Sequence, residues 1–366
     1  MTKPIYDFAI VGAGMAGASL AAELAGDASV IVLEAEDVPG YHTTGRSAAF
    51  WEECYGGPEI VPLTLASGAM LREGGFLTPR GALYIGRKQD KRKIDSFFDR
   101  FGGTGVTIER LDRQRLSERV SGLRADWCDA VWEPACADID VAGLHAHYLS
   151  RARKSGGVFE MRARLAEATR KDCTWMLRTA DQRTYRAAVL VNAAGAWADP
   201  VAEMAGAEPL GITPLQRTVV QIVVDPVPPA DLPLVLDISG KFYFKPDAGR
   251  IWLSPHDETP TVPHDAAPEE LAVAEAIARF EEVVDWMPKK VERKWAGLRS
   301  FAPDRAPVYG LDPEVAGFAW FAGQGGYGIQ TAPAAALLMS DTLLDRAPSL
   351  AVTQIDKSLY APGRFG

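Results

Sequence analysis

Residues 8–34, FAIVGAGMAGASLAAELAGDASVIVLE, place a glycine-rich turn and a helix-forming stretch between two apolar runs typical of β-strands. The order strand, glycine turn, helix, strand is the layout of an adenine dinucleotide site. Gly12 permits the tight turn, Gly14 lets the backbone approach a pyrophosphate, and Gly17 lets the helix pack against the strand. Glu34 comes twenty positions after Gly14, where a carboxylate can accept hydrogen bonds from a ribose hydroxyl. The stretch predicts a bound dinucleotide but does not distinguish NAD from FAD.

Length and composition favour a globular protein that acts on small molecules. The chain has 366 residues, 47% of them hydrophobic, which suits two packed domains with room for a large cofactor. The net charge of −9 argues against a nucleic-acid partner, because binding to phosphates needs clustered Lys and Arg.

The cysteines, the histidines and the N-terminal run indicate a cytoplasmic protein without a metal site. No CxxC pair or metal-type spacing to histidine involves the four cysteines, which are Cys54, Cys128, Cys136 and Cys173. The five histidines show no catalytic or metal-binding spacing either. Asp7 and Glu23 interrupt the apolar N-terminal stretch, so we expect neither an export signal nor a membrane span.

Two later segments show the same pattern of a strand followed by a small-residue turn and a helix. In residues 185–206, Ala194 and Gly195 allow close backbone approach to a cofactor, although a well-packed corner explains them equally well. In residues 323–338, GQGGYGIQTAPAAALL, a glycine turn precedes a helix whose N-terminus would favour negative charge on a reduced flavin. A plain helix cap is an equal alternative there. Residues 214–247 alternate as strands do and predict a second sheet.

Taken in order, seven motifs make the chain resemble the D-amino-acid oxidase family of flavoproteins, and within it the branch of bacterial D-arginine dehydrogenases. The motifs are GAGMAGAS with Glu34, PGYHTTGRSAA, ADIDVAGLH, YRAAVLVNAAGAW, FYFKPDAG, WAGLRSF and QGGYGIQT. The resemblance implies FAD in place of NAD. It implies an α/β fold in which a Rossmann-like FAD-binding domain (1–50, 135–208 and 295–366) accompanies a substrate domain (51–134 and 209–294) built mainly on an antiparallel sheet.

The resemblance also assigns cofactor and catalytic residues. The cofactor set is Gly12, Gly14, Ala16, Gly17, Glu34, Thr43, Thr44, Arg46, Ser47, Ala48, Ala194, Gly195, Gly325, Gly326, Tyr327, Gly328, Ile329, Gln330 and Thr331. Arg299 matches the arginine that clamps a substrate carboxylate, and its planar guanidinium suits bidentate binding. Arg217 matches a second active-site arginine, Tyr243 and Tyr55 match phenols at the carboxylate end, and the Gly326 carbonyl would hold the amine.

The predicted substrate pocket departs from the D-arginine branch at two positions. Phe50 replaces a histidine, and Ala82 replaces the glutamate that pairs with a guanidinium group. A cationic side chain would then enter unpaired, so we expect D-Arg and D-Lys to be poor substrates. Glu53 is a possible replacement acid, and the remaining pocket residues are Trp51 and Gln330.

The predicted function is oxidation of a D-amino acid with a non-basic side chain to the imino acid, which water hydrolyses to a 2-oxo acid and ammonia. A glycine, sarcosine-type or N-alkyl amino acid oxidase, or a 2-hydroxy acid dehydrogenase, remains an alternative, and a non-catalytic dinucleotide-binding protein is a remote one. No cysteine follows Cys173, so we expect non-covalent FAD. Oxygen, a quinone or a carrier protein could accept the electrons.

Overall fold

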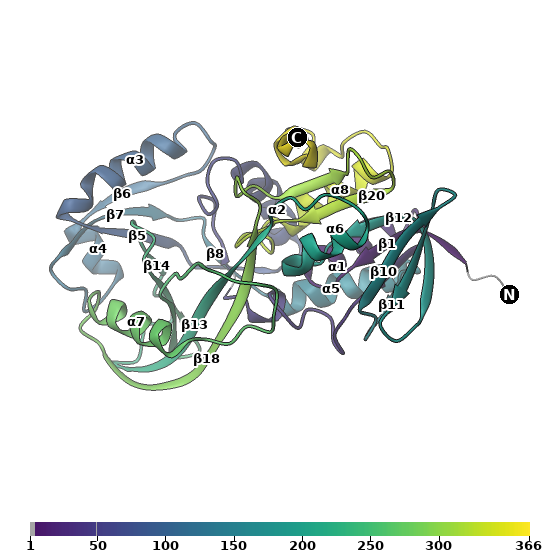
Figure 1. The fold of residues 1–366 in the computed structure, drawn as a ribbon. Helices are drawn as coiled ribbons and strands as arrows, with labels where there is room; N and C mark the ends of the chain where they lie inside the picture. The colour runs from purple at the N-terminus through teal and green to yellow at the C-terminus, as the bar shows by residue number, and fades with distance from the viewer. Residues whose placement is uncertain (1–3, 49) are drawn as a thin grey trace.

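A computed structural model describes residues 4–48 and 50–366; Ala49, the last residue of PGYHTTGRSAA, and residues 1–3 lie outside them. The described chain forms two large sheets, one in each half of the molecule, with helices around each (Figure 1). The long strands β13 (Thr213–Asp225) and β18 (Met287–Phe301) extend between the halves. This architecture confirms the predicted α/β fold class with a second, mainly antiparallel sheet.

The first sheet contains the dinucleotide motif. Its strands are β1 (Ile5–Val11), β2 (Val30–Leu33), β9 (Val158–Glu160), β10 (Leu165–Lys171), β11 (Thr174–Thr179), β12 (Thr184–Asn192), β19 (Val308–Leu311) and β20 (Phe318–Ala322). Strand β1 pairs in parallel with both β2 and β12. All four β2 residues are buried, as expected for a parallel sheet covered on both faces. Four helices surround this sheet: α1 (Met15–Leu24), α5 (Val141–Lys154), α6 (Ala198–Met204) and α8 (Ala332–Leu343).

Gly17 brings α1 into direct contact with the glycine turn. A Cβ atom at this position would overlap the carbonyl oxygen of Gly12. We therefore expect Gly17→Ala to lower the free energy of unfolding by about 3 kcal/mol, through overpacking against backbone that cannot rotate away. Denaturant unfolding measures this change. Gly26→Ala is the matched control because, its chain neighbours aside, no atom of the described residues lies within 4 Å of its added Cβ. Equal unfolding midpoints for the two variants would contradict the expectation.

The second sheet builds the other half of the molecule. Its strands are β5 (Ala82–Arg87), β6 (Glu109–Asp112), β7 (Trp127–Glu133), β13, β14 (Leu234–Asp237), β15 (Tyr243–Asp247), β16 (Arg250–Ser254), β17 (Thr259–Pro260) and β18. Among the strand pairs of this sheet in the described chain, the β14–β5 pair alone is parallel. The helices of this half are α3 (Lys91–Phe101), α4 (Arg113–Arg119) and α7 (Glu270–Glu281).

A small sheet and several short elements complete the described chain. Strands β3 (Phe50–Trp51) and β4 (Leu77–Pro79) both pair with β8 (Ala137–Ile139), and α2 spans Val61–Glu73. The 3-10 helices are η1 (Thr44–Arg46), η2 (Lys88–Asp90), η3 (Gly195–Trp197), η4 (Leu350–Val352), η5 (Lys357–Tyr360) and η6 (Pro362–Phe365). The domain boundaries remain a prediction, and β18 crosses the one placed between residues 294 and 295. Among the described helices, none combines the length and the apolar character needed to cross a bilayer.

Candidate active site

One cavity of about 430 Å³ extends from Glu34, just after β2, to Arg299 on β18. It brings together segments from all parts of the sequence. The predicted site residues that line it are Gly12, Gly14, Ala16, Glu34, Thr43, Thr44, Arg46, Ser47, Ala48, Ala194, Gly195, Arg217, Tyr243, Arg299, Gly325, Gly326, Gly328 and Ile329. Which of them contact a cofactor or a substrate stays a prediction.

The glycine turn forms one end of this cavity. Gly12 has a φ of +100°, and a Cβ there would lie 2.7 Å from the Ala193 oxygen, so only glycine fits the turn. The Glu34 carboxylate accepts a hydrogen bond from the backbone N–H of Ala13, at 2.7 Å. The first backbone N–H of α1, that of Met15, donates to Thr44 Oγ1 at 2.9 Å. A helix N-terminus and a nearby buried carboxylate are the groups that a pyrophosphate and a ribose require.

Sequence reasoning missed part of this end of the cavity. Residues 163–165 also line it, and Ala163 donates its N–H to the Glu34 carbonyl oxygen at 2.6 Å. Trp197 and His42 line it as well, with ring centroids 4.7 Å apart. Residues 163–165 have no motif of their own, so no sequence signal pointed to them.

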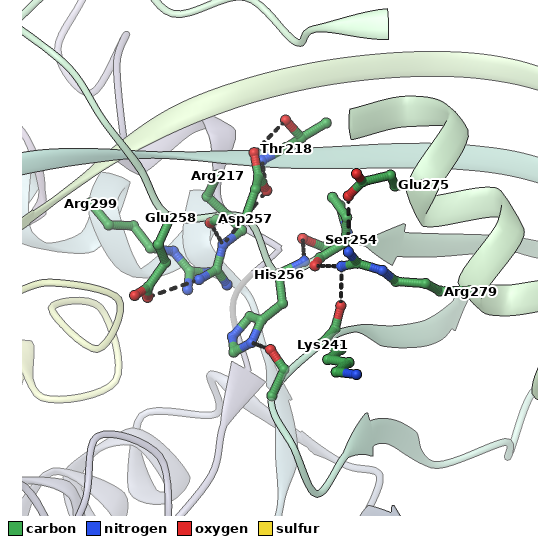
Figure 2. Close-up of polar contacts among 12 residues, drawn as sticks. Arg217, Thr218, Lys241, Ser254, His256, Asp257, Glu258, Glu275, Arg279 and Arg299 are labelled. Atoms are coloured by element: carbon green, nitrogen blue, oxygen red, sulfur yellow. Dashed lines mark hydrogen bonds and ion pairs between the residues drawn. The ribbon is translucent and has the colours of Figure 1, made fainter. Parts of the chain in front are cut away.

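Two arginines define the other end. Leu215 pairs with Arg299 and Arg217 pairs with Gly297 in the antiparallel β13–β18 ladder, which places both arginines on one face as diagonal neighbours. Figure 2 shows the two guanidinium groups close together beside Glu258. Arg299 is partly exposed and lines the cavity, and its Nη1 donates to Tyr55 Oη at 2.5 Å. Within residues 4–48 and 50–366, no carboxylate forms an ion pair with Arg299.

Arg217 is fixed by its neighbours yet keeps one donor unused. Its Nε donates to the Asp257 carbonyl oxygen at 2.7 Å, and its Nη2 donates to Glu258 at 3.1 Å. Burial, followed by the positive charge of Arg299, lowers the pKa of Arg217 to about 10. Its Nη1 is buried and finds no partner among the described residues. An anion between the two guanidinium groups would satisfy this donor and reduce their repulsion.

Arg299 itself is held in the charged form by its surroundings. Burial acts to lower its pKa, but Tyr55, Tyr243, Glu258 and Asp257 outweigh that effect and the pKa is raised. The nearby His256 behaves in the opposite way, because burial and the two arginines lower its pKa to about 3. This histidine is therefore neutral at physiological pH, with Nδ1 2.6 Å from the Gly240 oxygen.

A second unsatisfied polar atom belongs to Tyr243, which lines the same cavity. The Tyr243 hydroxyl is buried without a hydrogen-bond partner in the described part of the chain. Buried polar atoms are rarely left unpaired, so an orphaned hydroxyl and an orphaned guanidinium nitrogen in one cavity indicate a missing ligand. Hydroxyl and guanidinium donors together suit an oxygen anion such as a carboxylate.

The C-terminal glycine turn lies against the arginine end. Gly326 packs so closely that a Cβ would overlap Tyr55 Oη and lie 2.9 Å from Arg299 Nη1. The backbone N–H groups of Gly326 and Gly328 have no acceptor among the described residues. The regular part of α8 begins at Ala332, later than predicted, because residues 325–331 form consecutive turns.

Several predicted site residues do not line the cavity. Gln330 directs its amide to the Glu52 carbonyl oxygen (3.1 Å) and to Thr64 Oγ1 (2.9 Å). Trp51 is fully buried in the hydrophobic core, where its Nε1 donates to the Thr64 carbonyl oxygen. The others outside the lining are Gly17, Phe50, Glu53, Tyr55, Ala82, Tyr327 and Thr331. Tyr327 donates its hydroxyl to the Arg305 carbonyl oxygen, and Thr331 donates to the Tyr327 carbonyl oxygen at 2.9 Å.

Phe50 and Ala82 belong to an apolar cluster next to Tyr243. Its core members are Ala48, Phe50, Ala82, Cys136, Val219, Leu234, Leu236 and Tyr243. Beside this cluster lie two fully buried carboxyl groups that sequence reasoning did not single out, Glu52 and Glu133. Glu133 is the cross-strand partner of Ala82. Burial raises the pKa of both carboxyl groups. Glu53 is buried as well, 3.4 Å from the Thr107 N–H.

The family of this chain follows from comparison with known proteins. The FAD dependent oxidoreductase family matches residues 7–342, so the chain belongs to it. A search of characterised proteins gives L-2-hydroxyglutarate dehydrogenase of Salmonella houtenae, 22% identical over 63% of this chain. The chain spans 60% of that relative's length.

Two solved structures share the fold of the whole chain. Glycine oxidase of Geobacillus kaustophilus has a TM-score of 0.82 at 22% identity, covering 96% of this chain and 98% of its own. L-proline dehydrogenase of P. horikoshii has a TM-score of 0.86 at 20% identity, covering 100% and 98%.

These comparisons confirm the predicted resemblance at the level of the family, and FAD as the cofactor. The residues at the nucleotide end fit that cofactor. The glycine turn leaves no room for a Cβ, and the α1 N-terminus and Glu34 face the cavity. None of the four cysteines lines the cavity, and non-covalent attachment stays a prediction.

Proposed function

We propose that this oxidoreductase removes a hydride from the α-carbon of an amino acid of D configuration with a non-basic side chain. The observation that carries the proposal is the pair of unsatisfied donors, Arg217 Nη1 and Tyr243 Oη, in the cavity lined by Arg299. Three donor groups converge where a substrate carboxylate would bind. The D configuration follows the resemblance to D-amino-acid oxidases.

The residues of the chain would bind and orient the substrate. Arg299 would bind the carboxylate with two of its guanidinium nitrogens, while Tyr243 and Arg217 donate further hydrogen bonds. The Gly326 carbonyl oxygen, which accepts no hydrogen bond within the described chain, would accept one from the substrate amine. Bound FAD supplies the hydride acceptor. Fixing both ends of the amino acid holds its Cα–H in one orientation, which lowers the entropic part of the barrier.

The reaction needs no base from the protein if the amine binds deprotonated. Loss of a hydride from Cα and of a proton from nitrogen leaves an imino acid, and water hydrolyses it to a 2-oxo acid and ammonia. His256 is neutral but does not line the cavity, so we assign it no proton transfer. The electron acceptor remains open among oxygen, a quinone and a carrier protein.

The apolar cluster supports a non-basic side chain. Ala82 is fully buried, and Phe50 packs against both Tyr55 and Tyr243 with ring centroids 5.8 Å apart. Glu52 and Glu133 lie nearby, but they are fully buried and accept hydrogen bonds from backbone N–H groups. Neither is available to pair with a cationic side chain, so such a side chain would lose its hydration without compensation.

Anaerobic bleaching of the flavin absorption tests the proposal. We expect neutral D-amino acids to reduce the flavin with a kcat/KM at least tenfold above that of D-Arg, a modest value for one uncompensated charge. The panel should include L-amino acids, N-methyl amino acids, glycine and 2-hydroxy acids. The proposal would be contradicted if a 2-hydroxy acid or D-Arg bleached the flavin fastest. If no compound bleached it, the alternative of a non-catalytic dinucleotide-binding protein would be favoured.

A further inference from the structure

Two buried carboxyl groups next to the active site have no assigned role. Glu52, in the turn after β3, and Glu133, at the end of β7, both have a relative exposure of 0%. One carboxyl oxygen of each lies within 4.8 Å of the other. No Lys or Arg of the described chain forms an ion pair with either one. Two negative charges at this separation would be very costly in so buried a place.

The same carboxyl groups hold the turn that carries Tyr55. Glu133 Oε1 accepts the backbone N–H of Glu53 at 2.7 Å, and Glu52 Oε1 accepts that of Cys54 at 3.0 Å. The turn closes with Tyr55 N–H donating to the Glu52 carbonyl oxygen at 3.3 Å. The Tyr55 hydroxyl then meets Arg299 Nη1. An unbroken series of short-range contacts therefore connects the carboxyl pair to the proposed carboxylate clamp.

The surroundings of the pair supply few charges. From its own turn come Glu53 and Cys54, and from the packed elements come Tyr84 on β5, Cys136, Asp138 on β8, Lys245 on β15 and Arg72 on α2. Lys245 already pairs with Asp138 at 2.6 Å, and Arg72 stacks over the Trp51 ring at 4.4 Å. Tyr84 donates its hydroxyl to Glu52 Oε2 at 2.7 Å. None of these groups offers the pair a free positive charge. One of the two negative charges must therefore be neutralised in another way.

We propose that Glu52 and Glu133 share a single proton, and that this proton keeps the 52–55 turn in place so that Tyr55 stays against Arg299. The pair thus acts as a positioning device for the clamp, and its link to substrate binding rests on the proposed function. Sharing one proton between two buried carboxyl groups is a known solution to like charges held close together. Burial and the charge of Glu52 raise the pKa of Glu133 well above its ordinary value, so the shared proton is kept at pH values at which an exposed carboxyl group has lost its own.

Infrared spectroscopy tests the shared proton without any catalytic assay. At a pH just above the ordinary titration range of carboxyl groups, the C=O stretch of a protonated carboxyl group should be present in the holoenzyme. It should be missing from Glu133→Gln, whose amide replaces the proton donor. A band that persists in Glu133→Gln, or that is absent from the unmodified enzyme, would overturn the proposal. A divalent metal bound one to one and lost in Glu133→Gln would overturn it too, because Glu52, Cys54 and Glu133 offer ligand atoms within 4.8 Å of one another.

Binding of propionate, a carboxylate without an amine, tests the link to Tyr55. Its Kd, read from the flavin absorption spectrum, should rise about tenfold over the pH range in which the infrared band of the pair disappears. Over that range Tyr55 would move away from Arg299, and the clamp would lose one charge-assisted hydrogen bond. Glu133→Gln should bind propionate equally at all these pH values, and Glu133→Ala should bind weakly throughout. Asp237→Asn, which changes a buried carboxyl group on β14 that has no hydrogen bond to the pair among the described residues, should keep the pH dependence.

The two measurements separate the possible failures. The infrared band together with a pH-independent Kd in the unmodified enzyme would overturn the positioning role while leaving the shared proton intact. The infrared band together with no propionate binding at any pH would contradict the proposed function, and with it the role assigned to the pair.

Discussion

Arg299→Ala is expected to lower kcat/KM about a thousandfold, because two charge-assisted hydrogen bonds to the substrate carboxylate would be lost, each contributing about 1.5–3 kcal/mol. No protein carboxylate depends on this guanidinium in the described chain, so its removal leaves no buried acid unpaired. The glycine turn and Glu34 lie at the far end of the cavity, so the purified variant should remain yellow. Steady-state kinetics and the absorption spectrum of the holoenzyme measure both effects.

Arg299→Lys is the matched control. Lysine keeps the positive charge but cannot present two parallel N–H donors, so its kcat/KM should fall between those of Arg299→Ala and the unmodified enzyme. If Arg299→Ala retained most of its kcat/KM, the clamp would have to lie elsewhere in the cavity. If it lost the flavin, the substitution would report on cofactor binding and could not be used to assign the clamp.

The elements that were predictable from sequence are those governed by local patterns. The strand, glycine turn and helix of residues 8–34 follow from spacing alone, and the structure places them in the predicted order as β1, α1 and β2. Helix α7 likewise coincides with an amphipathic stretch after Pro268, and α5 with apolar residues at helical spacing from Val141. Each of these depends on residues close together in the chain, where hydrophobic periodicity and steric requirements suffice.

Side-chain directions in the substrate half were less predictable. Trp51 and Gln330 were expected at the pocket, but Trp51 points into the core and Gln330 turns its amide toward Glu52 and Thr64. Both sit in short or irregular segments, where no long repeat fixes which side faces the cavity. In contrast, Arg217 and Arg299 lie on long strands whose pairing register sets their common face.

The buried acid pair shows why some site features escape sequence reasoning. Glu52 and Glu133 are far apart in the chain and meet only because the turn after β3 packs beside the end of β7. Neither residue belongs to a motif with a fixed spacing. Glu133 is also the cross-strand partner of Ala82. This proximity depends on long-range strand pairing, which the sequence pattern does not specify.

Gly326→Ala is expected to lower kcat/KM at least a hundredfold without unfolding the protein. The backbone at Gly326 does not have a positive φ, so alanine adds no conformational strain there. Its Cβ would, however, overlap Tyr55 Oη and press on Arg299 Nη1. Displacing the clamp by about 1 Å is enough for a hundredfold loss, because the substrate would no longer present its Cα–H correctly. Steady-state kinetics and thermal unfolding measure the two quantities.

A double-mutant cycle with Tyr55→Ala separates this steric effect from a general disturbance of the glycine turn. Removing the Tyr55 ring opens the space that the new Cβ would enter, so Gly326→Ala should cost less than tenfold in the Tyr55→Ala background. A smaller loss in that background would show that Gly326 acts on Arg299 through its contact with Tyr55. Equal losses in both backgrounds would mean that Gly326 acts through its own backbone atoms, independently of the position of Tyr55.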